Sequence, residues 1–167
     1  NVPANAFLNL EGQKISTSLN WAVWVHEYLQ EFEGMQDVLR YNMIKNMPEQ
    51  RDSEFTWKNF QETNNNELVN NIANFVNRVI VLINKYYGGK VPDFDPNVEF
   101  TSGSNNTESY YDVELIDLYD KVQEMSDALY HFDFRGGLKS LMEISSIGNS
   151  LLQNNEPWKT IKTDHDL

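Results

Sequence analysis

Apolar residues recur at intervals of three and four positions through most of the chain beyond residue 53. The most regular row consists of Leu68, Ile72, Phe75, Val76, Val79, Ile83 and Tyr86. This spacing places the side chains on one face of an α-helix. Gly88–Gly89 and then Pro92 follow the row, and glycine followed by proline is a common signal for the end of a helix. The pattern therefore predicts a long amphipathic helix that ends at Gly88–Gly89.

Two more long helices are predicted from the same period. The first runs from about Ser109 to His131, and its apolar row is Leu115, Leu118, Val122, Met125 and Leu129. The second begins at an Asp133 cap, and its row is Leu138, Leu141, Met142, Ser145, Gly148 and Leu152. Because proline suits the first turn of a helix, Pro157 predicts a new helix at Trp158. Residues 92–107 are predicted to be a polar loop.

The first 52 residues show shorter and more mixed patterns. An apolar alternation with a turn at Glu11–Gly12 predicts a strand or hairpin, and a Ser/Thr-rich loop follows it. From Trp21 the stretch WAVWVHEYLQEF is helical in pattern. Asp37 is the expected N-cap of a second short helix, DVLRYNMIKN, which stops before Pro48.

A firm helix start is predicted in the stretch DSEFTWKNF. Thr56 can cap the helix there, while Phe55 and Phe60 occupy the positions of a hydrophobic staple. The predicted fold class is therefore all-α, with a helical bundle over residues 53–167 preceded by a short mixed strand, loop and helix segment over residues 1–52. The closing stretch TIKTDHDL is too short and polar to cover the last apolar face of a bundle. We therefore expect a truncated piece of a longer protein, whose open face could self-associate.

Composition places the chain among globular proteins without a membrane span. Hydrophobic residues make up 40% of the 167 residues, and no apolar run approaches the length of about 18 residues that suggests a transmembrane helix. The chain has no cysteine, which excludes disulfides and thiolate metal sites and suits the cytoplasm. The three histidines, His26, His131 and His165, lack the spacing of a metal site and are interpreted as surface or capping residues.

The net charge of −12 argues at first against a nucleic-acid partner. The acidic residues are concentrated, however, because residues 92–127 hold ten Asp or Glu and only Lys121. Residues 1–91 hold ten acidic against eight basic residues. The first half of the chain could therefore contact RNA while the acidic helix presents a solvated face.

The candidate chemistry lies on an asparagine-rich helix. The stretch NNNELVNNIANFVNRV contains seven asparagines in sixteen residues, although asparagine is a poor helix former. On a 3.6-residue period Asn70, Asn74, Asn77 and Arg78 form one ridge, opposite most of the apolar row. Amides and a guanidinium can read the base edges of single-stranded RNA. A plain solvated face, or amides bonded within the bundle, is the alternative interpretation.

Several stretches together resemble methionyl-tRNA synthetases of class I. ANFVNRVIVLINKYYGGKVP is similar to the start of the family's anticodon-binding bundle, and EGQKISTS is similar to its KMSKS loop. WVHEYL and DVLRY resemble the connecting helices, and NNEPW resembles the turn that presents a tryptophan. On this resemblance, residues 1–52 are the end of a catalytic domain with the connecting, stem-contacting segment, and residues 53–167 are the anticodon-binding bundle.

The resemblance implies specific RNA contacts. In the family, the Asn and Arg of an NxxxR motif and the Trp after a Pro contact the CAU anticodon of methionine tRNAs. These residues correspond to Asn74, Arg78 and Trp158. The spacing suits this role, because an i, i+4 pair projects side by side and an exposed indole can stack on a base.

The resemblance also implies an ATP-contacting loop formed by Lys14, Ile15, Ser16, Thr17 and Ser18. In the family this loop folds over ATP while methionyl-adenylate forms, and its lysines neutralise the leaving pyrophosphate. Here Thr17 replaces the second lysine and Leu19 stands where a basic residue is common. Lys14 alone is therefore expected to carry the charge. Without the resemblance, a plain surface loop is the simpler interpretation.

The expected activity of the parent enzyme is attachment of methionine to its tRNA with ATP. The family's HIGH signature, methionine pocket and zinc-bearing insertion belong ahead of Asn1, so no cofactor, zinc or catalysis is expected in this chain alone. Its expected partners are methionine tRNA and the rest of the parent synthetase. The alternatives are the same region of another class I synthetase, or a helical protein-interaction scaffold without RNA affinity. Trp21, Trp24 and Trp57 are interpreted as core or interface anchors, and Gly136–Gly137 as a site of close helix packing.

Overall fold

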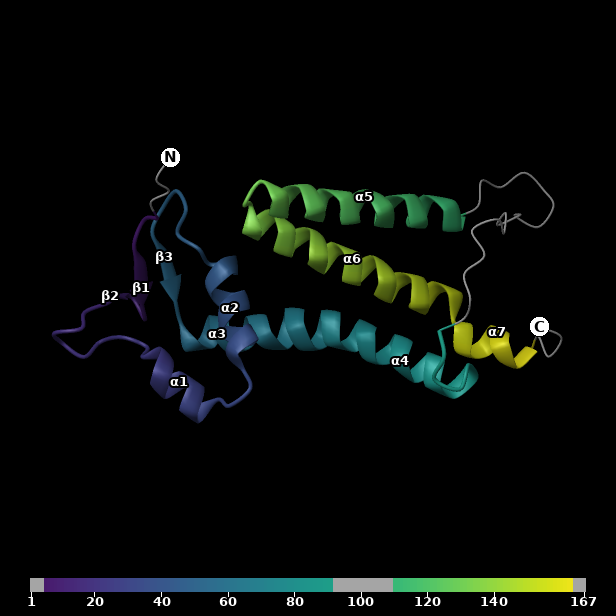
Figure 1. The fold of residues 1–167 in the computed structure, drawn as a ribbon, viewed down its shortest axis with the longest axis horizontal. Helices are drawn as coiled ribbons and strands as arrows, with labels where there is room; N and C mark the ends of the chain where they lie inside the picture. Colours follow the sequence, from purple (N-terminus) through teal and green to yellow (C-terminus); the bar gives the residue numbers. More distant parts are fainter. Residues whose placement is uncertain (1–4, 92–109, 164–167) are drawn as a thin grey trace.

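The computed structural model describes residues 5–91 and 110–163, with the side chains of residues 110–116, 160, 162 and 163 left undescribed. Long helices occupy most of the molecule, and a small sheet with two short helices lies at one end (Figure 1). The predicted fold class, a helical bundle behind a short mixed segment, is confirmed. Within the described residues, no helix is both long and apolar enough to cross a membrane. The predicted loop at residues 92–107 lies outside the described residues.

The sheet joins the beginning of the chain to the start of the bundle. Strand β1, Leu8–Leu10, pairs antiparallel with β2, Gln13–Lys14, and parallel with β3, Ser53–Phe55. The strand order is therefore β2-β1-β3. The turn between β1 and β2 has positive φ at Glu11 (48°) and Gly12 (77°), as the predicted hairpin requires. Strand β3 is not evident in the sequence pattern, because it is only three residues long.

The first two helices are shorter or shifted relative to their predicted bounds. Helix α1 covers Val25–Glu31 and does not begin at Trp21. Residues before it are held in an extended form, because Trp21 forms a bridge with Ser16 and its Nε1 donates to the Leu10 carbonyl at 3.1 Å. Helix α2 covers Gln36–Lys45, so Asp37 lies in the first turn and is not the N-cap. An acidic residue there still favours the helix through the macrodipole.

The longest helical segment runs without a break from residue 57 to residue 86. It consists of α3, Trp57–Thr63, then η1, Asn64–Ala73, then α4, Asn74–Tyr86. The predicted start is confirmed, because the Thr56 side chain accepts from the Asn59 backbone amide at 3.0 Å and the Phe55 and Phe60 rings lie 5.8 Å apart. The middle part is a π-helix, in which each turn contains more residues than an α-helical turn. The asparagine-rich stretch is therefore wider than an ordinary helix.

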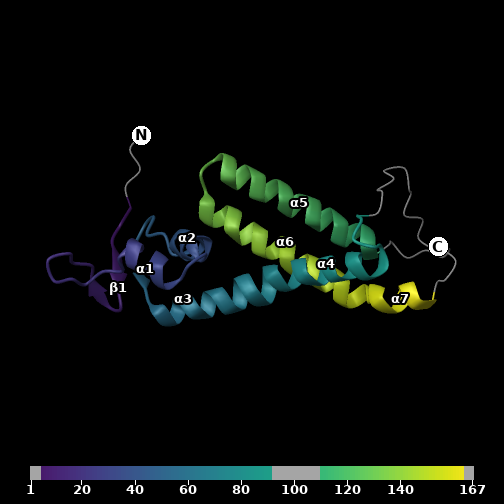
Figure 2. The ribbon, with the colours of Figure 1, turned by 60° about the horizontal axis from the view of Figure 1, so that its bottom comes forward.

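The remaining helices complete the bundle. Helix α5 covers Tyr110–Tyr130, α6 covers Phe134–Asn155 and α7 covers Pro157–Thr163, close to the predicted bounds. The predicted Asp133 cap is confirmed, since its side chain accepts from the Gly136 amide at 2.8 Å. Helix α6 runs antiparallel to α5 and contacts η1 and α4 along its other side (Figures 1 and 2).

Close approach between the helices depends on two glycines of α6. A Cβ atom built on Gly148 would lie 2.5 Å from the ring of Phe75 on α4, and one built on Gly137 would lie 2.8 Å from the Leu129 side chain on α5. The prediction of close packing at Gly137 is therefore confirmed. At Gly136, by contrast, the neighbouring atoms are those of the capping carboxylate of Asp133.

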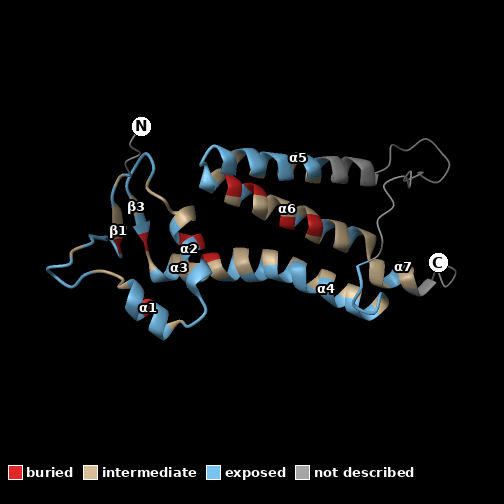
Figure 3. Ribbon diagram, in the orientation of Figure 1, coloured by how far each residue is buried: buried red, intermediate tan, exposed pale blue. Residues whose placement is uncertain are grey.

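Few side chains of the described residues are fully buried (Figure 3). The buried apolar residues are Leu10, Tyr28, Tyr41 and Phe55. They lie in the sheet and the short helices, whereas Ser140 and Ser145 are buried on α6 and Thr63 is buried at the end of α3. The bundle is therefore held together by small and polar residues as much as by apolar ones.

Candidate nucleic-acid interface

Two residues predicted to read RNA, Asn74 and Arg78, lie one turn apart on α4 and face α6. Asn74 Nδ2 donates to Asn149 Oδ1 at 3.2 Å, and Arg78 Nη1 donates to the same oxygen at 3.3 Å. Arg78 Nη2 also donates to Gln153 Oε1 at 3.4 Å. Asn74 is exposed and Arg78 is half-buried. The pair therefore forms a fixed polar surface along the α4–α6 seam, with part of each side chain open to solvent.

The third predicted residue, Trp158, joins this surface from α7. Its ring lies under the Arg78 guanidinium, whose Cζ is 5.5 Å from the ring centroid. Figures 1 and 2 show α7 beside the C-terminal end of α4, as this contact requires. Trp158 is half-buried, so it is less exposed than the predicted free-standing indole. A guanidinium over an indole is a favourable cation–π arrangement.

A shallow groove of about 220 Å³ adjoins the Arg78–Trp158 contact. It is lined by Arg78, Val81, Leu82, Lys85, Tyr86 and Trp158. The hydroxyl of Tyr86 is buried and finds no hydrogen-bond partner among the residues the structure describes. An apolar floor with cationic groups at its edge suits a flat aromatic ligand that carries a neighbouring negative charge.

The predicted asparagine ridge divides into two sets in the structure. Asn70 and Asn77 are exposed and make no side-chain hydrogen bond within the described part of the chain. Asn74 and Arg78 instead turn towards α6, so the four residues do not act as one surface. The two forms of the alternative interpretation therefore each hold in part: some amides bond within the bundle and others form a solvated face.

Three residues of this network were missed from sequence. Asn149 and Gln153 lie on α6, and Asn71 lies in the π-helix, where its Nδ2 donates to the Met142 carbonyl at 3.0 Å and to Ser146 Oγ at 3.1 Å. Asn149 could have been found, because it follows Gly148 and lies four residues after Ser145, both members of the predicted inner row. A polar residue on that face must find partners across the helix interface.

The predicted ATP-contacting loop lies on the sheet, at the far end of the molecule from α7. Lys14 is the last residue of β2, and its Nζ lies 5.3 Å from the centre of the Phe7 ring. Ser16 Oγ and Ser18 Oγ lie 3.1 Å apart, and Thr17 and Ser18 are exposed. Leu19, which replaces a basic residue of the family pattern, is 79% exposed. The loop is therefore a solvent-facing hairpin with hydroxyl groups and one cation available for contact.

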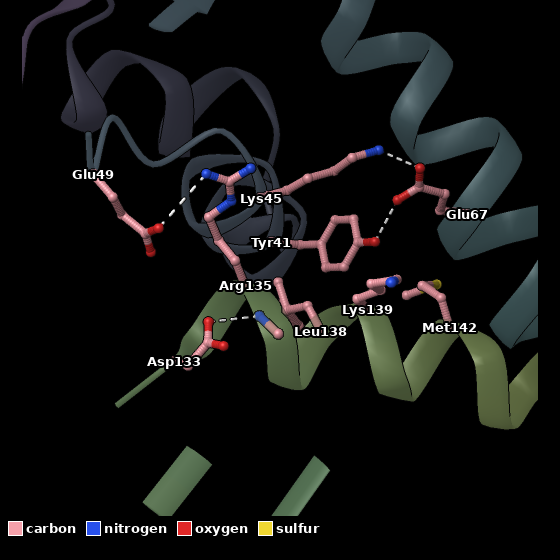
Figure 4. Close-up of a pocket in the computed structure, with 10 residues that line it drawn as sticks. Tyr41, Lys45, Glu49, Glu67, Asp133, Arg135, Leu138, Lys139 and Met142 are labelled. Atoms are coloured by element: carbon pink, nitrogen blue, oxygen red, sulfur yellow. Dashed lines mark hydrogen bonds and ion pairs between the residues drawn. The ribbon is translucent and has the colours of Figure 1, made fainter. Parts of the chain in front are cut away.

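A second groove, of about 560 Å³, lies between α2, η1 and the N-terminal end of α6 (Figure 4). Four of its charged groups form two pairs, Lys45 with Glu67 and Arg135 with Glu49. The Tyr41 hydroxyl and Lys45 Nζ donate to the two carboxylate oxygens of Glu67, and Arg135 lies 3.6 Å from Glu49. Burial and the adjacent Glu67 carboxylate raise the pKa of Tyr41 above its ordinary value, so this phenol remains a donor. The groove therefore serves chiefly to fasten α2 to the bundle.

The other predicted surface features can be checked only where side chains are described. His26 and His131 are exposed, and His131 Nδ1 lies 2.8 Å from the Asp127 carbonyl, in agreement with their interpretation; His165 lies outside the described residues. Trp21 and Trp57 are 37% and 41% exposed and line a shallow pocket with Trp24, so none of the three is a core residue. Within the described chain, no cluster of His, Asp and Glu is placed to hold a metal ion.

The exposed face of α5 agrees with the prediction of a solvated acidic surface. The carboxylates of Asp117, Asp120, Glu124 and Asp127 are all exposed. Lys121, at 3.0 Å from Glu143 on α6, links this helix to its neighbour. Among the described residues, this acidic face therefore lies on α5, which packs on α6, whereas the Asn74–Arg78 pair lies on α4.

Comparison with known proteins supports the predicted resemblance. Residues 1–80 match the family model for tRNA synthetases class I (M), and residues 102–167 match that for the anticodon binding domain of methionyl tRNA ligase. A methionine–tRNA ligase of Porphyromonas gingivalis is 53% identical over 165 residues, which make up 98% of this chain and 23% of that protein. One of Flavobacterium johnsoniae is 52% identical over 162 residues, or 97% of this chain and 21% of that protein.

A solved structure is similar in fold. Mycobacterium tuberculosis methionyl-tRNA synthetase in complex with methionyl-adenylate matches with a TM-score of 0.71 and 19% identity, over 95% of this chain and 29% of that one. The present chain thus spans less than a quarter of the length of the curated relatives described above.

Proposed function

The chain belongs to the methionyl-tRNA synthetase family, and on that basis we propose that its α4–α6–α7 surface reads the CAU anticodon of methionine tRNA. In this proposal, Asn74 and Arg78 hydrogen-bond to base edges and Trp158 stacks on an unpaired base. The proposed activity of the longer protein is ATP-dependent attachment of methionine to that tRNA in the cytoplasm. The exposed Lys14–Ser18 hairpin would contact the ATP phosphates, with Lys14 as its one cation.

The observation that supports this proposal most strongly is the contact of Trp158 with the Asn74–Arg78 pair. Asn74 and Arg78 share one acceptor on α6, and the Arg78 guanidinium lies over the Trp158 ring. Eighty positions of sequence separate Arg78 from Trp158, so only the fold brings them together. An amide, a guanidinium and an indole beside an apolar groove are the groups that recognise unstacked RNA bases.

A titration of the chain with RNA stem-loops tests the proposal. We expect tighter binding to a CAU loop than to a scrambled loop of the same length, measured by fluorescence anisotropy at fixed salt. Trp158→Ala should reduce affinity for the CAU loop about 5- to 160-fold, because base stacking on an aromatic side chain contributes roughly 1–3 kcal/mol. Asn74→Ala should reduce discrimination between the loops.

Asn77→Ala is the matched control for Asn74→Ala. Asn77 is an exposed asparagine on the same helix without a side-chain partner in the described residues, so its removal should leave both affinities unchanged. Equal binding of the two loops by the wild-type chain would reject the proposed RNA recognition. Equal effects of the two asparagine substitutions would reject the role of Asn74.

A second proposed property is self-association through an apolar stripe on η1 and α4. Val69, Val76, Ile80 and Tyr87 are 50%, 46%, 51% and 48% exposed. Their spacing places them on the side of the helix opposite Asn74 and Arg78, away from α6. An exposed stripe of this kind favours contact with a second apolar surface.

We expect sedimentation equilibrium to show a concentration-dependent dimer that Ile80→Glu shifts towards monomer. Asn77→Glu introduces the same charge on a neighbouring polar face and should have little effect. A monomeric mass for the wild-type chain across the micromolar range would contradict self-association, without bearing on RNA recognition.

A further inference from the structure

The side-chain amide of Asn149 lies at the centre of the polar network between α4, η1 and α6. Its Nδ2 donates to the Asn71 carbonyl at 3.1 Å and to the Ser145 carbonyl at 3.1 Å. Its Oδ1 accepts from Arg78 and from Asn74. Both ends of the amide are therefore engaged, and the half-buried side chain links the three helical segments.

The orientation of the Asn149 amide is determined by partners that cannot exchange roles. Backbone carbonyls only accept hydrogen bonds, so the atom beside Asn71 and Ser145 must be the Asn149 nitrogen. A guanidinium only donates, so the atom beside Arg78 must be the Asn149 oxygen. A turned Asn149 amide would place oxygen against two carbonyls and nitrogen against a cation.

This fixed orientation determines which end of Asn74 faces the solvent. Because Asn149 offers its oxygen, Asn74 must donate its Nδ2 to it, as the structure shows at 3.2 Å. The Oδ1 atom of Asn74 is then left as a hydrogen-bond acceptor, with no partner among the described residues. An isolated asparagine could turn its amide and recognise either a donor or an acceptor, whereas the amide of Asn74 is held in one orientation.

From this geometry we infer that Asn149 is a positioning residue, which fixes the amide of Asn74 so that it reads an amino group of an RNA base. The inference rests on the proposed anticodon recognition. The base it selects carries an exocyclic amino donor, as cytosine and adenine do, and not a carbonyl at the same position, as uracil and inosine do. Asn149 itself does not contact the RNA.

Loops that exchange one amino group for a carbonyl test the inference directly. Wild-type chain should bind a CAU loop more tightly than a loop with uracil for cytosine, or inosine for adenine, by about three- to tenfold at the base that Asn74 reads. We call this ratio the amino preference. In Asn149→Ala the Asn74 amide is free to turn, so the amino preference should fall below twofold.

Asn149→Asp distinguishes positioning from a general structural role. The aspartate keeps an oxygen for Asn74 and Arg78 but cannot donate to the Asn71 and Ser145 carbonyls. The bundle should therefore melt at a lower temperature while the amino preference is kept. Asn154→Ala, an exposed asparagine on the same helix, is the control and should change neither quantity. In the Asn74→Ala background, Asn149→Ala should have no further effect on the amino preference.

The outcomes separate the two proposals. Equal binding of all loops by the wild-type chain would reject the proposed anticodon recognition and, with it, this inference. An amino preference that Asn74→Ala removes but Asn149→Ala retains overturns the inference and leaves anticodon recognition standing. If thermal melting shows that Asn149→Ala does not fold, the Asn149→Asp variant provides the test instead. Retention of the amino preference in Asn149→Asp would support the positioning role of Asn149, and loss of the amino preference would overturn that role.

Discussion

Replacement of Arg78 by alanine is expected to reduce the preference for a CAU loop over a scrambled loop by about 5- to 160-fold, since a side chain that contacts a base edge contributes roughly 1–3 kcal/mol to discrimination. The guanidinium connects three parts of the surface, because it donates to Asn149 and Gln153 and lies over the Trp158 ring. In the proposed recognition, its loss removes a base contact, and it also removes the guanidinium from the Trp158 ring. Parallel titrations of both loops at two salt concentrations would measure the change.

Two further substitutions separate this effect from charge alone. Arg40→Ala removes the same charge from an exposed arginine on α2 that pairs with Asp37. It should therefore weaken binding to both RNA loops slightly and by the same factor. Arg78→Lys keeps the charge but loses the planar guanidinium. Compared with Arg78→Ala, it should bind RNA more tightly but should not regain discrimination between the CAU loop and the scrambled loop. Full discrimination by Arg78→Lys would show that Arg78 acts only as a point charge.

Gly148→Ala is expected to lower the free energy of unfolding by about 1–3 kcal/mol, the usual cost of adding a methyl group to a closely packed interior. The new Cβ would lie 2.5 Å from two carbon atoms of the Phe75 ring, and Gly148 is buried between α6 and α4. Because the Phe75 ring must move to make room, the cost of this contact exceeds the gain from the higher helix propensity of alanine. Urea unfolding followed by circular dichroism would give the difference.

Gly137→Ala provides a comparison within the same helix. There the added Cβ meets the flexible end of the Leu129 side chain. The higher helix propensity of alanine should offset most of the free-energy cost of this contact, so the free energy of unfolding should change little. Combining Gly148→Ala with Phe75→Leu should restore part of the lost stability, because the smaller side chain leaves room for the methyl group. A Gly148→Ala chain as stable as the wild type would contradict the packing described here.

The long helices were predictable because their apolar spacing and end signals agree with one another. Asp133 caps α6 and Thr56 caps α3, and both positions could be identified from the local sequence. The start of α1 could not, because the extended residues before it are held by Trp21, whose indole bonds to a carbonyl of β1. Strand β3 likewise depends on a partner more than forty residues away.

The candidate site was predictable only in part, for a related reason. Asn74 and Arg78 stand out at helical spacing, and Trp158 is marked by the proline before it. The π-helix was not predicted, because the choice between α- and π-turns over Asn64–Ala73 depends on what packs against them. Asn71 was missed because it looks like any other asparagine in a chain that contains 21 of them, whereas Asn149 was marked only by its place next to the inner row of α6. Their roles appear only when α6 is placed against η1.

The parallel pairing of β1 with β3 has a mechanical consequence. Strand β3 leads through Thr56 directly into the helical segment that ends at Tyr86, which is roughly 45 Å long at ordinary helical rise. The sheet and this segment are therefore continuous along the chain, with the Lys14 hairpin at one end and Arg78 towards the other. A rotation of the segment by about 5° about its start would move its far end by about 4 Å over that length. A small change in the orientation of the sheet relative to the bundle thus corresponds to a larger displacement at the opposite end of the segment.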